Sequence, residues 1–337
     1  MSHRNPDSLA AAAGSWSRYW ASGALHSCPG AFTGNYDDEV REHWLAFFGR
    51  LPDGARVLDI GTGNGAVAFL ARDAAKAGGR DFHMEGIDVA VIDPAAAAAR
   101  HGVDIDGIVF RSATSSERTG YPESHFDAVS SQYAIEYSNV AESLEELARI
   151  LKPGGQAGFV IHHVDSKAVE AARAELRAFE YLRHEAPVLL QSRRLLERLQ
   201  PARNTADLAL RMQERESRKQ RKEVEKLLRR AMSFARSRPG AAFVEGIAQQ
   251  IAMTLQGTNK TGPAAALARL ANLADEMTAH QSRLRAIVRS AYDRNDIDEF
   301  CGRALAAGFA VETPRELLRR AQDLMGWVVS ASVPRRK

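Results

Sequence analysis

Short apolar runs alternate with helix-forming segments along the first half of the chain. Runs at 57–60, 82–87, 108–111, 126–130 and 156–162 are typical of strands buried in a sheet. Between most of them, apolar positions recur every three or four residues, as they do along one face of a helix. This alternation predicts a doubly wound, mostly parallel α/β sheet.

The alternation stops after the fifth strand. From about residue 165 to about residue 293 the sequence is rich in Ala, Leu, Arg, Glu and Gln and shows no strand pattern. A helix at 297–307, a short strand at 309–312 and a last strand at 327–333 then resume the pattern. We therefore predict a sheet of seven strands and a large α-helical insertion after strand five.

A glycine-rich turn follows the first strand. Gly61, Gly63 and Gly65 occupy alternate positions, and helical spacing begins at Asn64. Glycine lets the backbone approach a ligand closely, and N–H groups at a helix start attract polar or anionic groups. The turn also fits the G-x-G-x-x-A form of nicotinamide-binding proteins, and such turns occur without any ligand. The motifs downstream must decide between these alternatives.

Composition indicates the class of protein. The chain has 337 residues, 45% of them hydrophobic, which suffices for one large or two ordinary domains. No apolar run approaches the ~20 residues of a membrane helix, and the first residues lack the pattern of a secretory signal. Cys28 and Cys301 form no metal-spaced cluster. We expect a reduced, cytoplasmic protein without structural zinc or a membrane partner.

Four motifs occur where the predicted strands begin or end. They are VLDIGTGNG at 57–65, GID at 86–88, FDAVSSQYAIEY at 126–137, and LKPGG followed by GFVI at 151–161. Together they resemble the class I S-adenosylmethionine-dependent methyltransferases. The closing helix, short strand, helix and last strand are similar to the end of that Rossmann-like fold, in which the last strand is antiparallel.

The resemblance implies S-adenosylmethionine as the cofactor. In the family, the acidic residue before the glycines, here Asp59, serves the cofactor's ammonium, and Asp88 would accept hydrogen bonds from the ribose hydroxyls. Many members carry an acidic residue after strand three for adenine, and here a hydroxyl or backbone group must replace it. The expected cofactor contacts are Asp59, Gly61, Thr62, Gly63, Asp88, Ser112, Ala113, Thr114, Ser131 and Gln132.

Catalytic groups should follow strands four and five. Methyl transfer is an in-line displacement in which the enzyme aligns the reactants and, where needed, removes a proton. His162 or His163 could be that base, and Tyr133 and Glu136 are the other candidates. Strand four ends without the Asp of metal-dependent catechol-type enzymes, so no metal is expected. Asn- or Asp-Pro-Pro-Tyr and Pro-Cys motifs are missing too, which disfavours adenine, glutamine and cytosine acceptors.

The predicted organisation has four parts. Residues 1–52 form an aromatic-rich helical cap, 53–164 the cofactor-binding core, 165–293 the insertion, and 294–337 the end of the sheet. The insertion leaves the carboxyl end of strand five, so it could be an acceptor lid or an oligomerisation element that forms a homodimer. Residues before Ser15 are expected to be a loose tail. Aromatic residues of the cap either pack on the sheet or cover a ligand: Trp16, Tyr19, Trp20, Tyr36, Trp44, Phe47 and Phe48.

The net charge of +3 conceals an asymmetry. Residues 192–240 contain 15 Lys and Arg against 6 Asp and Glu, a local balance of +9. The basic helix at 211–230 could hold an acidic partner, although a solvated polar face would also explain it.

Three functions fit these features. The first is methyl transfer to a small or medium organic acceptor, free or bound to a carrier protein. The second is an RNA methyltransferase that holds phosphates with the basic helix, although interleaved Glu residues weaken this hypothesis. The third is a non-catalytic binding subunit, which the intact glycine turn with Asp59 and Asp88 disfavours.

Overall fold

The computed structural model describes residues 6–28, 32, 34–238 and 241–335. Positions 1–5, 29–31 and 33 of the predicted cap lie outside these residues. The chain forms two compact units, one from residues 1–170 together with 286–337, and one from residues 171–285.

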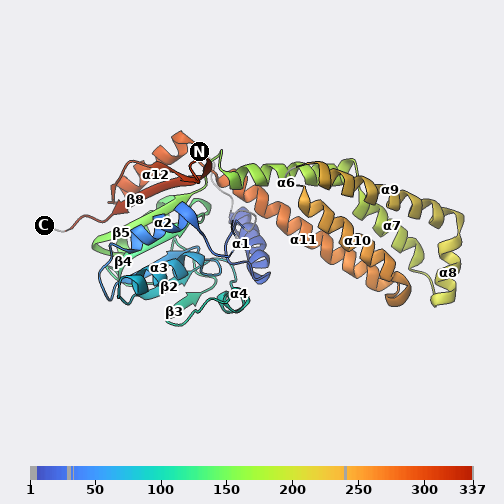
Figure 1. Cartoon of the computed structure of the whole chain (residues 1–337), viewed down its shortest axis with the longest axis horizontal. Coiled ribbons are helices and arrows are strands. Elements are labelled where there is room, and N and C mark those ends of the chain that lie inside the picture. The colour runs from blue at the N-terminus through green and yellow to red at the C-terminus, as the bar shows by residue number, and fades with distance from the viewer. Residues whose placement is uncertain (1–5, 29–31, 33, 239–240, 336–337) are drawn as a thin grey trace. The chain divides into compact units, whose positions relative to one another are not determined.

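The first unit is built on one sheet (Figure 1). Its strands are β1 (Arg56–Ile60), β2 (His83–Ile87), β3 (Ile108–Arg111), β4 (Phe126–Gln132), β5 (Leu151–Ile161), β6 (Ala310–Val311), β7 (Arg315–Arg319) and β8 (Asp323–Ser332). The order is β3-β2-β1-β4-β5-β8-β6, with β1 to β5 parallel and β8 antiparallel to β5. The doubly wound α/β fold is confirmed. Chain connections run outward in both directions from β1 and β4, which places a ligand crevice at their carboxyl ends.

The prediction of seven strands was wrong, because the described residues form eight. The additional strand, β7, replaces the helix expected between the last two strands. β6 and β7 pair with successive parts of β8 and are separated by Glu312–Pro314, where Pro314 has no N–H to donate. In β7, Leu317 and Arg319 are buried and their neighbours exposed. This two-residue period is hard to recognise because one inward residue is charged.

Helices cover both faces of the sheet. α2 (Asp38–Phe48), α3 (Ala66–Ala77) and α4 (Pro94–His101) contribute to one core, and α5 (Val140–Ile150) and α12 (Arg294–Ala306) to the other. A short 3₁₀ helix, η1 (Ile135–Tyr137), follows β4. Successive residues of β1 point to opposite faces, so Val57 joins the first core and Leu58 the second. Trp44, Phe47 and Phe48 lie in the first core, as the packing alternative predicted. α1 (Pro6–Ala21) extends into the segment expected to be a tail.

The second unit contains helices and no strand among its described residues. The chain passes through α6 (Lys167–His184), α7 (Val188–Leu199), α8 (Thr205–Gln213), α9 (Arg215–Ser237), α10 (Ala242–Thr261) and α11 (Pro263–Ser290). Leu196, Leu227, Ile251 and Leu270 belong to one hydrophobic core, so α7, α9, α10 and α11 pack together. The basic helix predicted at 211–230 is interrupted at Glu214, whose ψ of 144° is not helical, so this segment is divided between α8 and α9. Across the described residues, no helix has both the length and the apolar character that a membrane span requires.

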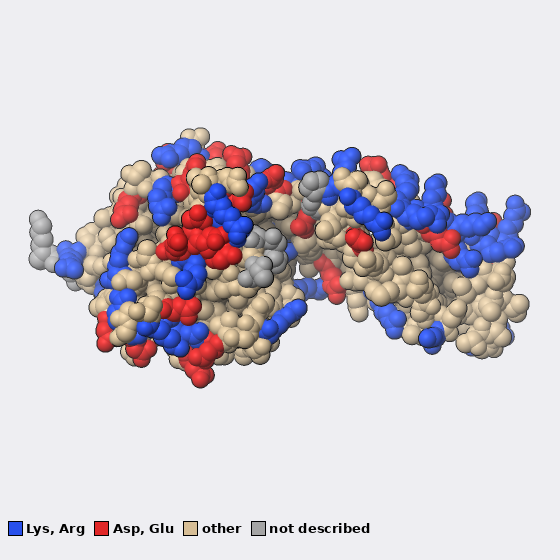
Figure 2. Space-filling model, viewed as in Figure 1, with Lys and Arg blue, Asp and Glu red and all other residues tan. Residues whose placement is uncertain are grey.

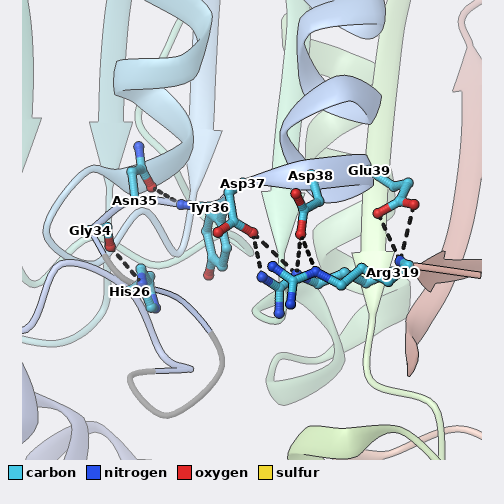
Figure 3. A network of polar contacts seen from close by, with 9 residues as sticks. His26, Gly34, Asn35, Tyr36, Asp37, Asp38, Glu39 and Arg319 are labelled. Carbon is cyan, nitrogen blue, oxygen red and sulfur yellow. Dashed lines mark hydrogen bonds and ion pairs between the residues drawn. The ribbon is translucent and has the colours of Figure 1, made fainter. Parts of the chain in front are cut away.

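A buried arginine joins the end of β7 to the start of α2 (Figure 3). Arg319 donates from Nη2 to Asp37 Oδ1 at 2.8 Å and from Nε to Asp38 Oδ2 at 3.1 Å. Its guanidinium also lies 4.6 Å from the ring centroid of Phe32. The Arg319 side chain is 9% exposed, whereas those of Asp37 and Asp38 are 39% and 34% exposed. This cluster fixes the C-terminal hairpin against α2.

Replacing Arg319 with Met should lower the free energy of unfolding by about 2 kcal/mol. The Arg319 guanidinium is buried, but its carboxylate partners remain partly hydrated. The expected loss of stability is therefore smaller than for a fully buried ion pair. Arg320→Met is the matched control: Arg320 Nε also donates to Asp38, yet its side chain is 62% exposed, so its replacement should lower the free energy of unfolding clearly less than Arg319→Met does. Urea unfolding measures both, and equal losses would contradict this account.

Candidate active site

The glycine turn between β1 and α3 is tightly enclosed. Gly61 and Gly63 have φ angles of 60° and 51°, in the left-handed region that favours glycine. A Cβ atom on Gly61 would collide with that of Ala134, and one on Gly63 would lie 2.5 Å from the Trp20 ring. The turn therefore requires glycine at both positions. Gly65 precedes α3 and provides no side-chain cap for its first N–H groups.

Two buried carboxyl groups flank this turn. Asp88 follows β2 and accepts hydrogen bonds from the N–H groups of Gly63 at 2.9 Å and Ala90 at 2.8 Å. Burial raises the pKa of Asp88 to about 6, although these two hydrogen bonds oppose the increase. Burial raises the pKa of Asp59, in β1, to about 7, opposed by the hydroxyl of Ser130, which donates to it at 2.7 Å.

These groups fit the cofactor implied by the sequence. A buried carboxyl such as Asp59 is stabilised as carboxylate by a cation, which suits an ammonium group. A carboxylate has about four acceptor positions, and the two hydrogen bonds to Asp88 leave capacity for ribose hydroxyls. Glycine at positions 61 and 63 lets Ala134 and the Trp20 ring pack directly on the backbone of the turn, which places Trp20 beside the two carboxyl groups.

The segment after β3 is held against the residues after β2. The N–H of Thr114 donates to the carbonyl of Asp88 at 2.9 Å, and Ser112 Oγ accepts from Ile92 N at 3.1 Å. Ala113 has a φ of 52°. The structure thus brings positions 112–114 to Asp88, and their contact with adenine remains a prediction.

Two exposed valines in the same loop were not predicted. Val89 and Val91 are 58% and 64% exposed, directly after Asp88. They offer an apolar surface to a flat ring beside the candidate ribose contact. The sequence contained a signal for them: Val89 and Val91 follow Asp88, which ends the predicted strand, so they are apolar residues in a loop and not in the buried sheet.

The residues that end β4 make contacts within the protein. Ser131 Oγ accepts from the N–H of Ile135 at 3.2 Å, and Gln132 Oε1 accepts from Trp44 Nε1. Tyr133 donates its hydroxyl to the carbonyl of Met325 at 2.9 Å. Burial raises the pKa of Tyr133 well above its ordinary value, so this phenol is poorly suited to act as a base.

Glu136 and His162 form a buried pair. The Nδ1 atom of His162 lies 2.6 Å from Glu136 Oε1, which also accepts the backbone N–H of His162 at 3.0 Å. Their exposed fractions are 0% and 1%. The Tyr133 ring centroid lies 4.3 Å from that of the imidazole. The carboxylate fixes the orientation of the ring, and Nε2 has no hydrogen-bond partner among the described residues.

His163 is engaged differently. Its Nδ1 accepts the N–H of Asp165 at 2.9 Å, and its Nε2 lies 3.9 Å from Glu316 Oε1. The ring centroid is 4.7 Å from that of Trp327 in β8. The structure therefore groups Tyr133, Glu136 and His162, whereas His163 contacts β7 and β8.

Asn64 is a structural residue of the site that the sequence analysis missed. It is fully buried, and its Nδ2 donates to the carbonyls of Trp20 at 3.0 Å and Ala24 at 2.7 Å. Its Oδ1 accepts the N–H of Asp93 at 3.0 Å. One side chain thus ties the end of α1 and the loop after β2 to the glycine turn. A buried amide within an apolar segment must find such partners, which was the available signal.

Aromatic side chains of α1 lie beside the glycine turn. Trp20 packs against Gly63 and stacks on Trp16, with ring centroids 5.7 Å apart. Trp16 also meets the Tyr137 ring edge to face at 5.9 Å. Tyr36 instead lies in the first core and stacks on His26 at 4.8 Å. The sequence did not decide whether the aromatic residues of the cap pack on the sheet or cover a ligand. Trp16 and Trp20 lie at the glycine turn, next to the candidate cofactor residues.

Comparison with known proteins identifies the family of this chain. A family model described as a methyltransferase domain matches residues 32–208, more than half of the chain. This chain belongs to that methyltransferase family. The class I resemblance is confirmed, and S-adenosylmethionine is the cofactor of the family. No curated protein matches the sequence.

Solved methyltransferase structures show limited similarity to the chain. A chain of the complex between the Haloferax volcanii Trm112 methyltransferase activator and a methyltransferase is 27% identical, with 37% of this chain and 52% of that chain covered and a TM-score of 0.31. An S-adenosylmethionine-dependent methyltransferase from Methanosarcina mazei is 12% identical, with 86% and 98% covered and a TM-score of 0.39. Phosphoethanolamine N-methyltransferase 2 from Haemonchus contortus is 16% identical, with 92% and 55% covered and a TM-score of 0.36. This chain spans about half the length of the first of these solved chains.

Cofactor binding should release protons near pH 6.5. Asp59, with a pKa of about 7, is then largely protonated, and a cationic group beside it should favour the carboxylate. Calorimetry in buffers of different ionisation enthalpy should show release of up to about one proton at pH 6.5 and much less at pH 8, where Asp59 is already ionised.

Asp59→Asn should remove most of this release, and the remainder would belong to Asp88, whose pKa is about 6. Release that is unchanged in Asp59→Asn would show that the cofactor's ammonium does not bind at Asp59.

Proposed function

We propose that the protein transfers a methyl group from S-adenosylmethionine to a small or medium organic acceptor, free or bound to a carrier protein. The buried Glu136–His162 pair is the observation that carries this proposal. These residues follow β4 and β5, and the carboxyl ends of parallel strands meet at one edge of a sheet. The pair is therefore expected at the same edge as the glycine turn and Asp88.

We assign the cofactor contacts as the sequence and geometry suggest. The methionine portion would lie on Asp59, Gly61, Thr62 and Gly63, and the ribose on Asp88. Adenine would contact 112–114, and Ser131 and Gln132 would complete the site. We also propose metal-independent chemistry, because β4 ends in these two residues and not in a metal-binding Asp.

The proposed roles follow from what each group can do with a proton. The cofactor supplies a methyl carbon activated by its positively charged sulfur, which is displaced in line. As the acceptor atom bonds to that carbon and the carbon–sulfur bond breaks, His162 Nε2 would take the acceptor's proton. The Glu136 carboxylate at Nδ1 would stabilise the imidazolium ion that results.

His162→Ala should lower turnover by ~10²–10⁴-fold and leave cofactor affinity nearly unchanged, because only proton removal is lost. His163→Ala is the matched control and should lose much less, since its contacts are with Asp165, Glu316 and Trp327. Transfer of labelled methyl groups to an acceptor fraction from host extract measures turnover, and calorimetry measures cofactor affinity.

Glu136→Gln should lower turnover and leave cofactor affinity nearly unchanged, because the imidazolium ion that forms on His162 loses its anionic partner. Full activity in both single histidine variants and in the double variant would exclude histidine as the base.

One observation favours a second candidate function, methyl transfer to RNA. Cations line the face of α9 opposite its buried side, which includes Val224, Leu227 and Ala231. This basic face consists of Arg215, Arg218, Lys219, Lys222, Lys226 and Arg229, whose spacing of three or four residues places them on one side of the helix. None of the six forms an ion pair with another described residue. Figure 2 shows Lys and Arg gathered along this helix.

The basic face is suited to a polyanion. Like charges three and four residues apart repel each other along a helix, so an anionic partner should stabilise α9. RNA phosphates or an acidic carrier protein would supply the negative charge. For the insertion at 165–293 we retain two proposals, an acceptor lid or a homodimer element.

Charge reversal tests the basic face. The triple variant Arg218→Glu, Lys219→Glu and Lys222→Glu should bind single-stranded RNA more weakly, and the slope of log affinity against log salt should fall by about two. A free small acceptor should still be methylated normally. Binding is measured by fluorescence anisotropy at 50–200 mM salt, the range in which phosphate contacts weaken strongly, with polyglutamate as the acidic-protein probe.

The matched control reverses three exposed arginines of α7, Arg193, Arg194 and Arg198, which changes the net charge equally. If both triple variants lose RNA binding equally, the change in net charge explains the loss. The basic face of α9 is then not the RNA-binding site.

A further inference from the structure

The helical unit contains a cavity of about 280 Å³. Its walls come from α6, the turn after α6, the start of α7, and parts of α10 and α11. All the lining residues belong to the second unit, at 171–285. None of them is among the residues assigned above to methyl transfer.

Most of the cavity wall is hydrocarbon. Leu182, Val188 and Ile247 line it and are also part of the core of the unit. Leu190, another lining residue, is 47% exposed, so a large apolar side chain lies open to solvent there. The space is partly open to solvent, so water contacts these apolar side chains, and an apolar occupant would displace that water.

One part of the wall is polar. Arg183 lies there with Gln281, and its Nη2 is 3.5 Å from Gln281 Oε1. No ion pair joins Arg183 to another described residue. Two acidic residues of the same helix are already engaged, Glu180 with His184 at 3.3 Å and Glu175 with His280 at 2.6 Å. The cavity therefore combines apolar side chains with an exposed guanidinium group at its edge that forms no ion pair with another described residue.

We propose that this cavity binds an amphipathic carboxylate, with its hydrocarbon chain inside and its carboxylate on Arg183. A guanidinium group binds a carboxylate through two parallel hydrogen bonds, which a neutral or cationic head group cannot reproduce. The volume is near the lower end of the ~300–1,000 Å³ typical of small-molecule pockets, so it suits a short chain. This site goes beyond the proposed methyl transfer and does not depend on it.

Calorimetry of the full chain with octanoate tests the proposal, with octylamine as the cationic analogue of similar size. Octanoate should bind saturably with one site per chain, at least tenfold more tightly than octylamine. Arg183→Gln should lower octanoate affinity about tenfold or more. Arg177→Gln is the matched control, because Arg177 is exposed on the same helix and does not line the cavity; it should bind as the unchanged chain does.

A second variant fills the cavity. Ala274→Phe places a ring among the lining residues and should abolish octanoate binding, with circular dichroism as the check on folding. If this variant fails to fold, the comparison of Arg183→Gln with Arg177→Gln decides. Asp59→Asn should leave octanoate binding unchanged, which separates this site from the cofactor site. The proposal is overturned if octanoate does not bind saturably, if octylamine binds equally well, or if Arg183→Gln binds octanoate normally.

Discussion

The candidate site depends on the hydrogen bond from the N–H of Gly63 to the carboxylate of Asp88. This bond joins the turn after β1 to the end of β2, two neighbouring strands whose carboxyl ends would otherwise carry independent loops. Trp20 closes the turn from the other side, and Asn64 ties that tryptophan's backbone to the same segment. The backbone of the turn, the Asp88 carboxylate and the Trp20 ring are therefore held in fixed positions relative to one another.

The two buried carboxyl groups lower the stability of the folded chain as the pH rises. The pKa values of Asp59 and Asp88 are raised in the folded chain, so the folded state binds protons more tightly than the unfolded state. Their contribution favours folding fully at pH values below their unfolded pKa and is lost as the pH rises through about 6 for Asp88 and about 7 for Asp59. At neutral pH Asp88 is mostly ionised and Asp59 is partly ionised, so negative charge is buried with incomplete compensation. A bound cation beside Asp59 would relieve this cost, so stability and ligand binding are linked through the same carboxyl group.

The helical unit carries two chemically distinct features on its own core. α9 contributes Leu227 and Ala231 to that core and presents its basic face on the opposite side. The cavity on α6, α7, α10 and α11 has an apolar wall and one unpaired guanidinium. The sequence contains many arginines in this unit, and only the packing of α6 against α7 and α11 shows that Arg183 lies at the edge of a cavity.

The sequence by itself determined the parallel sheet, the glycine turn with Asp59 and Asp88, and the methyltransferase family, because strand and helix periods and strand-end motifs are local signals. It could not identify β7, where one of the two inward residues is an arginine that pairs with Asp37 and Asp38, nor the break at Glu214. Tertiary structure alone paired His162 with Glu136 and placed His163 beside Trp327, since neighbours in sequence point in different directions at the end of a strand. Asn64 and the cavity at Arg183 likewise arise from contacts between distant segments. Contacts between distant segments produce no repeating pattern in the sequence. They nevertheless determine which polar groups are available for binding or catalysis.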